Sequence, residues 1–110
     1  MSESLTQRWR EAVKRLEAQF GEGMDMEAIL FLIGIRELGV VPGRLNKDQK
    51  LDVMHIAVCK LLSEYGYYNL VGQDDDGWPH WERTQKLPSL KPMEQDRLMR
   101  EAIVDYLDKL

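Results

Sequence analysis

The residues that could do chemistry gather in one segment, GQDDDGWPHWERT, which covers residues 72–84. Its candidate side chains are three consecutive aspartates, a histidine and two tryptophans: Asp74, Asp75, Asp76, His80, Trp78 and Trp81. Carboxylates beside an imidazole can hold a metal ion or transfer protons. Aspartate and glycine also favour a tight turn between two strands, so a structural interpretation competes with the chemical ones.

An EF-hand calcium loop is the most specific metal motif to which the aspartates could belong. Such a loop needs acidic residues at positions one, three and five, glycine at six and glutamate at twelve. With Gly77 at position six, Asp74 and Asp76 fall at three and five, but Gly72 and Arg83 occupy positions one and twelve. The motif fails at both ends. The pattern therefore favours a plain turn, with a weakly bound divalent ion as the alternative.

A second chemical pair, His55 and Cys59, is four residues apart in a segment with helical periodicity. Both side chains would point the same way, which is a spacing that a zinc or copper site can use. Two ligands are too few, and the others would have to come from His80 or an aspartate. Because Cys59 lies between Val58 and Leu61, burial should raise the pKa of its thiol and hide it from substrates. The pattern favours a packed thiol.

Known catalytic motifs are missing from the chain. It has no glycine-rich phosphate loop, no serine nucleophile elbow and no zinc-protease motif. We therefore expect a protein that is not an enzyme and that uses no cofactor. The sequence identifies no small-molecule substrate.

The composition is that of a folded protein. Hydrophobic residues make up 44% of the 110 residues and charged residues 31%, whereas disordered chains combine few apolar residues with high net charge. A chain of this length buries roughly two-thirds of the surface that it exposes when unfolded. We therefore expect one domain that spans residues 1–110.

The expected location is the cytoplasm. The first twenty residues lack the apolar core of a signal peptide. The longest apolar stretch, AILFLIGI at residues 28–35, is far shorter than the ~20 residues that span a bilayer. A single cysteine, Cys59, cannot form an internal disulfide and fits a reducing compartment.

The net charge of −4 comes entirely from the second half of the chain. Residues 1–50 carry eight basic and eight acidic side chains, while residues 51–110 carry seven basic and eleven acidic ones. Three of those eleven are the aspartates of the expected turn. Complementary charge speeds and orients encounter between proteins, so a basic partner would suit this turn.

The spacing of apolar residues predicts two helices in the first forty residues. The first begins after Ser4, a suitable N-cap, and stops at Gly21. The second ends at about Leu38 and is apolar around nearly all of its circumference, which predicts a central helix at residues 29–35. Gly34 in this helix would allow a close approach by a neighbouring helix.

Two further helices follow. Asn46 and Gln49 have the spacing of a capping box, which predicts the start of a third helix that ends near Gly66. Its expected apolar stripe is formed by Leu51, Met54, Val58, Leu61, Leu62 and Tyr65. Pro92 suits the first turn of a fourth helix.

Between the third and fourth helices, the sequence predicts a β-hairpin at about residues 67–85. Aromatic and β-branched residues flank a cluster of turn residues. The turn should be of type I with a glycine bulge, closed by Asp74 and Trp78, which places Val71 opposite Trp81. The expected fold class is therefore mainly α, with four helices and one hairpin.

The order helix, helix, helix, hairpin is also that of a winged helix-turn-helix domain. In such a domain the third helix would enter the major groove of DNA and the hairpin would touch the backbone. Three aspartates at the tip of the wing would repel phosphates, and the third helix mixes Lys47 and Lys50 with Asp48 and Asp52. The charge pattern thus disfavours nucleic-acid binding, which stays an alternative.

Five aromatic residues surround the expected hairpin: Tyr65, Tyr67, Tyr68, Trp78 and Trp81. Two strands that are apolar on both faces need a cover on each face. Helices of the same chain could supply both covers. Alternatively, one face could anchor a partner protein, because tryptophan and tyrosine are frequent anchors of interfaces.

The segment LDVMHIAVCKLLSEYGYYNLVGQDDDGWPHWERTQKLP resembles a family of small, uncharacterised bacterial proteins. The Tyr-Gly-Tyr-Tyr and Asp-Gly-Trp-Pro-His stretches carry the likeness, which covers about the middle third of the chain. The resemblance implies a bacterial cytoplasmic origin. It implies no activity, ligand or partner.

From these observations we expect a non-enzymatic protein-interaction module or a small homo-oligomer. Its contact residues would be those of the hairpin: Asp74, Asp75, Asp76, Trp78, His80 and Trp81. The main alternative is a metal-binding protein that uses the hairpin aspartates and His80, with His55 and Cys59 as further candidate ligands.

Overall fold

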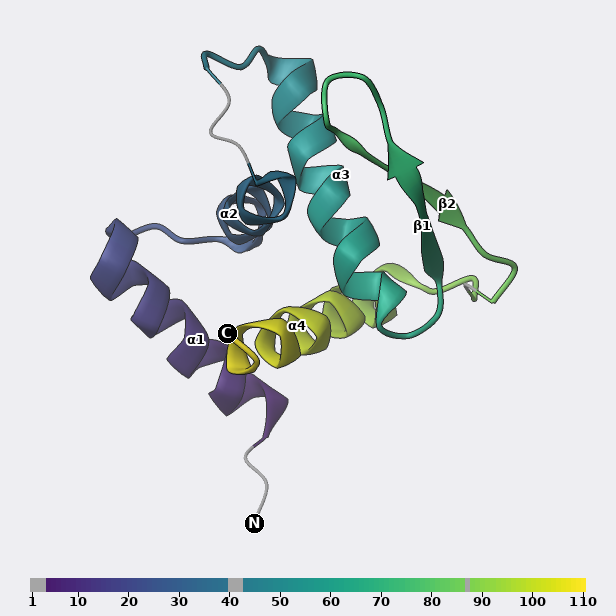
Figure 1. The fold of residues 1–110 in the computed structure, drawn as a ribbon. Helices are drawn as coiled ribbons and strands as arrows, with labels where there is room; N and C mark the ends of the chain where they lie inside the picture. Colours follow the sequence, from purple (N-terminus) through teal and green to yellow (C-terminus); the bar gives the residue numbers. More distant parts are fainter. Residues whose placement is uncertain (1–3, 40–42, 87) are drawn as a thin grey trace. The chain divides into compact units, whose positions relative to one another are not determined.

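The computed structural model describes residues 4–39, 43–86 and 88–110 (Figure 1). Its elements in chain order are α1 (Leu5–Phe20), α2 (Met26–Leu38), α3 (Lys47–Ser63), β1 (Tyr68–Gln73), β2 (Pro79–Arg83) and α4 (Pro92–Asp108). The expected fold class, mainly α with a hairpin between the third and fourth helices, is confirmed. No helix within the described ranges is both long and apolar enough to cross a bilayer.

Local sequence signals set the starts of three helices. At α1, the Ser4 hydroxyl accepts a hydrogen bond from the backbone N–H of Gln7 at 3.2 Å. At α3, the Asn46 side chain accepts from the Gln49 N–H at 2.8 Å, and the Gln49 side chain accepts from the Asn46 N–H at 3.0 Å. Pro92 opens α4, where an N–H would have no helical partner. The predicted starts are confirmed.

Packing divides the chain into two compact units. One consists of Met1–Met26 and Ser89–Leu110 and contains α1 and α4. The other, Glu27–Pro88, contains nearly all of α2 together with α3 and the hairpin. The expectation of a single domain over residues 1–110 stays a prediction.

In the first unit, α1 packs on α4 through charged and aromatic contacts. The Arg8 guanidinium pairs with Asp105 at 3.0 Å and with Asp108 at 2.8 Å. Nearer the start of α4, the Arg100 guanidinium lies 5.0 Å from the ring centroid of Trp9, a cation–π contact. These contacts tie the start of α1 to the second half of α4.

In the second unit, α2 approaches α3 at Gly34. A Cβ atom at this position would overlap the Val53 carbonyl oxygen and would lie 2.7 Å from Val53 Cγ1. The predicted close approach is therefore confirmed, and Val53 is the residue that requires it. The buried apolar side chains of this unit are Ile29, Leu30, Ile33, Leu38, Val53, Ile56, Ala57, Cys59, Leu61 and Leu62.

The buried side of α3 differs from the predicted apolar stripe. Leu51, expected in the stripe, is 54% exposed, whereas Val53 is fully buried. Met54 and Val58 are only half-buried. Because α3 meets α2 at Val53 and also packs against the hairpin, it has two covered sides, and a single stripe cannot describe it.

The hairpin is a two-stranded antiparallel sheet that packs on α3 (Figure 1). Its register pairs Gln73 with Pro79 and Gly72 with His80, as the turn predicts. The register then shifts, so that Leu70 lies opposite Trp81. The predicted pair of Val71 and Trp81 is therefore wrong, because Val71 is the extra residue of a β-bulge.

Candidate functional site

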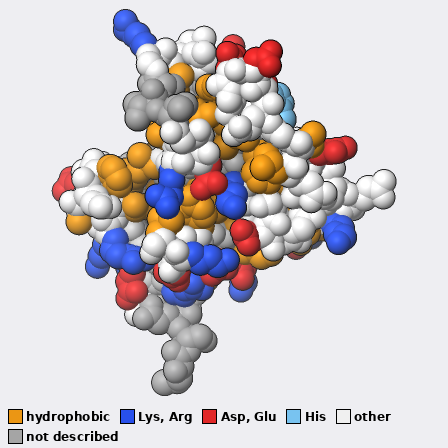
Figure 2. All heavy atoms as spheres, in the orientation of Figure 1, with side chains coloured by type: hydrophobic (Ala, Val, Ile, Leu, Met, Phe, Trp, Pro, Cys, Tyr) orange, Lys and Arg blue, Asp and Glu red, His pale blue; other side chains and the backbone are white. Residues whose placement is uncertain are grey.

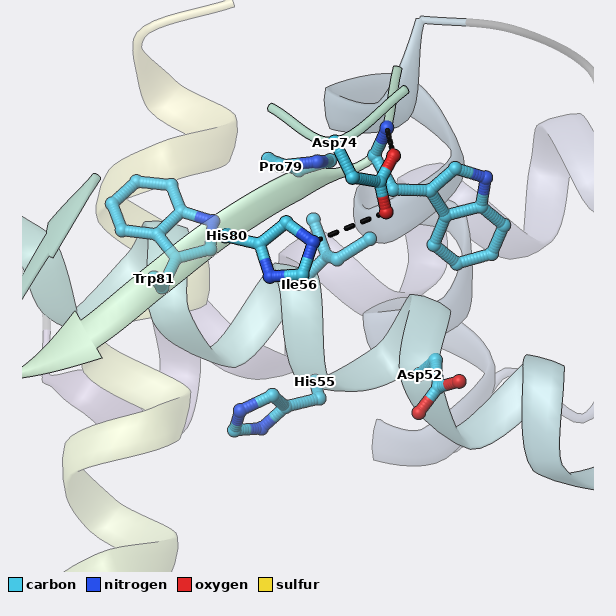
Figure 3. A pocket seen from close by; sticks show the side chains of 8 residues that line it. Asp52, His55, Ile56, Asp74, Pro79, His80 and Trp81 are labelled. Atoms are coloured by element: carbon cyan, nitrogen blue, oxygen red, sulfur yellow. Dashed lines mark hydrogen bonds and ion pairs between the residues drawn. The ribbon is translucent and has the colours of Figure 1, made fainter. Parts of the chain in front are cut away.

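A pocket of about 390 Å³ lies between α3 and the hairpin (Figure 3). Its lining residues come from α3, from the turn and from β2: Asp52, His55, Ile56, Asp74, Trp78, Pro79, His80 and Trp81. In Figure 3, Asp52 and His55 lie on α3 below the opening, and Asp74 and His80 lie above it. The volume is within the range of sites that bind small groups. Four of the six predicted site residues thus line one cavity.

Asp74 organises the turn. Its Oδ1 accepts hydrogen bonds from the backbone N–H groups of Asp76 at 3.0 Å and Trp78 at 2.9 Å. The backbone N–H of Asp74 donates to the Trp78 carbonyl, and the Gly77 N–H donates to the Asp74 carbonyl, each at 3.0 Å. Gly77 has a φ of +83°, a left-handed conformation that favours glycine. The predicted turn closed by Asp74 and Trp78 is confirmed.

The second carboxylate oxygen of Asp74 lies 3.1 Å from Nε2 of His80. The pKa of Asp74 is lowered, first by the hydrogen bond from the Trp78 N–H and then by the one from His80. The carboxylate is therefore ionised at neutral pH. His80 is 63% exposed, so its ring remains open to solvent beside this negative charge.

Asp75 and Asp76 form the tip of the turn, and both are exposed. Neither carboxylate makes an ion pair with a residue in the described part of the chain. Figure 2 shows acidic side chains together at the turn end of the hairpin, at the top of the view. The two aspartates outside the pocket thus present their charge to solvent.

Trp78 and Trp81 are both half-buried and line the pocket. The indole Nε1 of Trp81 is buried and has no hydrogen-bond acceptor within the described residues. Across the sheet from Trp81, Leu70 is 56% exposed, and the bulged Val71 is 66% exposed. The two tryptophans are therefore neither core residues nor free surface residues.

His55 and Cys59 share one side of α3, as their spacing predicts. Cys59 Sγ lies 3.4 Å from His55 Nε2, and the His55 ring contacts Tyr68 edge to face with centroids 6.3 Å apart. Cys59 is fully buried, and desolvation raises the pKa of its thiol to about 11. The thiol is therefore protonated at neutral pH and can donate to a neutral imidazole. This arrangement is that of a packed thiol.

The candidate metal ligands do not converge. Two pairs are present, Asp74 with His80 and His55 with Cys59. Across residues 4–39, 43–86 and 88–110, no three histidine, cysteine, aspartate or glutamate side chains are grouped so that they could hold one ion. A structural zinc site needs four ligands and a catalytic one needs three. The described residues thus offer at most two ligands at either place.

The sequence did not predict three of the pocket residues as site residues: Asp52, Ile56 and Pro79. In the sequence, Asp52 is one of the mixed charges of its helix. Its position three residues before His55 was the available signal, because residues three apart share one side of a helix. Ile56 and Pro79 carry no chemical signal of their own, and only the packing of the hairpin on α3 brings them to the pocket.

No protein-family model, curated protein or solved structure matches this chain. The fold and the site define the class of protein, which is a mainly α-helical protein with a pocket between a helix and a β-hairpin. The resemblance to small bacterial proteins stays a prediction.

Proposed function

We propose that this protein is a non-enzymatic protein-interaction module whose contact surface is the hairpin. The observation that carries the proposal is a pair of adjacent apolar residues, Leu70 and Val71, which are 56% and 66% exposed beside an acidic turn. Apolar residues rimmed by charge are typical of protein contact sites. A partner that covers both would remove them from water.

The hairpin backbone supports the same function. Within the described residues the sheet has only two strands. Each strand therefore has one edge that is not paired with another described strand. Such edges carry N–H and C=O groups that can pair with an added strand of another protein. The bulge at Val71 interrupts pairing on β1, so β2 is the more regular edge.

The charge of the turn indicates the kind of partner. Asp74 is ionised, and Asp75 and Asp76 stand exposed without an ion-pair partner in the described part of the chain. A basic protein surface complements these three charges. The same charges disfavour nucleic acid, whose phosphates they would repel. A second copy of this chain is the alternative partner.

The proposal is tested by capture from an extract of the source cells with paired baits. Wild-type protein is compared with Leu70→Ser and with Phe20→Ser, a matched control on α1 that is 57% exposed. We expect proteins that bind the wild type and the Phe20 variant but are lost with the Leu70 variant. A native mass spectrum of each bait reports self-association. Equal capture by all three baits, with all three monomeric, would contradict the proposal.

A further inference from the structure

The pocket between α3 and the hairpin combines aromatic walls with acidic groups. Trp78 and Trp81 contribute the walls, and Asp52 and Asp74 contribute the carboxylates. Among the described residues, no lysine or arginine side chain lines it. Aromatic faces and carboxylates both attract cations, and the two features occur together in one cavity.

Of the two carboxylates that line the pocket, only that of Asp74 forms hydrogen bonds with other described residues. Asp74 is occupied by the turn and by His80. Asp52 is exposed on α3 and makes no ion pair with any described residue. His55 and His80 are the remaining titratable groups of the lining within the described part of the chain. A cationic group in the pocket would therefore find Asp52 as a free partner and Asp74 as a second one.

We infer that the pocket receives the guanidinium group of an arginine side chain from the partner protein. This inference rests on the proposed function, because it assigns an anchor to the partner that binds the hairpin. Guanidinium is planar, stacks on tryptophan and offers a fork of N–H donors to carboxylates, whereas an ammonium group is a more strongly hydrated point charge. The pocket lining supplies both tryptophan side chains and carboxylates.

A metal ion is the weaker occupant for the same cavity. The lining has two tryptophans, a proline and an isoleucine but no three grouped metal ligands among the described residues. Metal ions of biological sites are held by several oxygen, nitrogen or sulfur ligands, not by aromatic faces. An arginine side chain uses the apolar part of the lining as well, because its methylene stem packs on it.

The probe is a blocked peptide, acetyl-Gly-Arg-Gly-amide, titrated into the full chain labelled with ¹⁵N. The control peptide carries citrulline, which has the shape of arginine without its charge. We expect the indole N–H signals of Trp78 and Trp81 to move with the arginine peptide, while Trp9, in the other unit, stays unchanged. Signals that do not move, or that move equally with citrulline, would overturn the inference.

Three charge variants locate the binding groups. Asp52→Asn and Asp74→Asn each remove one pocket charge, and Asp75→Asn removes a charge from the turn outside the pocket lining. We expect the first two to weaken the arginine peptide at least about tenfold, since charged hydrogen bonds exceed the free energy of a tenfold change. The Asp75 variant should bind within about twofold of the wild type. Equal weakening by all three would overturn the inference.

The design separates folding defects from binding defects and this inference from the proposed function. Asn at position 74 keeps the oxygen that accepts the turn hydrogen bonds, and Asp52 lies on an exposed helix position away from them. The ¹⁵N spectrum of each variant reports whether the turn is retained. If the arginine peptide leaves the pocket signals unchanged while capture still depends on Leu70, the arginine anchor is refuted and the interaction surface is retained.

Discussion

Replacement of Gly34 by alanine tests the close packing of α2 on α3. The added Cβ would overlap the Val53 carbonyl oxygen and would stand 2.7 Å from Val53 Cγ1. A side chain could rotate away, but a backbone carbonyl cannot, so α2 and α3 would have to separate. We therefore expect Gly34→Ala to destabilise the protein, although alanine favours a helix.

The magnitude follows from two opposing contributions. Overpacking typically costs about 1 to 3 kcal/mol, and the overlap with a backbone carbonyl places this contact at the upper end, about 3 kcal/mol. Alanine in place of glycine inside a helix returns about 1 kcal/mol. The net loss in the free energy of unfolding is therefore about 2 kcal/mol. With a urea dependence of about 2 kcal/mol per molar for a small protein, the midpoint should fall by about 1 M.

Urea unfolding followed by circular dichroism measures this difference. Gly43→Ala is the matched control, because nothing lies within 4 Å of a Cβ built there and the residue has no left-handed backbone. We expect its midpoint to stay within error of the wild type. A Gly34 variant as stable as the wild type would refute the close packing of α2 on α3.

Three further predictions concern single groups. Asp74→Ala should increase amide exchange at Trp78, because it removes the acceptor of that N–H. Asp74→Asn should leave the exchange rate unchanged, because asparagine keeps an acceptor oxygen. Hydrogen exchange detected by ¹⁵N NMR measures both rates. The thiol of Cys59 has a pKa of about 11 in the native protein. At pH 8 it should therefore react with iodoacetamide at least about a hundredfold more slowly than the same thiol in the unfolded chain. Mass spectrometry measures both alkylation rates. The pKa of Asp108 lies below its ordinary 3.8 because of the hydrogen bond from Arg8. Its stabilisation of α1 on α4 is thus complete only above about pH 5 and is lost as pH falls through the lowered pKa. Acid titration of ellipticity should therefore show a smaller loss in Asp108→Asn.

Local signals in the sequence were sufficient to predict where three helices begin and where the hairpin turns. Ser4, Asn46 and Pro92 mark helix starts through contacts with residues within one turn, so their effect does not depend on the rest of the fold. The turn at Asp74 is equally local, because every hydrogen bond that closes it joins residues 74–78. Elements defined by neighbours along the chain are therefore predictable.

Features that depend on packing were harder to predict. Leu51 and Val53 are both aliphatic and stand two positions apart in α3, yet only Val53 is buried, because α2 contacts α3 at that position. The bulge at Val71 breaks strict alternation, and the available signal was Gly72 beside it, because an isolated glycine inside a strand suggests a bulge. Asp52 joins the pocket only because the hairpin lies over α3.

Hydrogen–deuterium exchange of the protein bound to its captured partner tests the proposed contact surface most directly. If the hairpin is that surface, protection on binding should be concentrated in β1, the turn and β2, with α3 affected near Asp52. Amides of α1 and α4 should exchange as in the free protein. Protection confined to α1 and α4, with an unchanged hairpin, would contradict the proposed function.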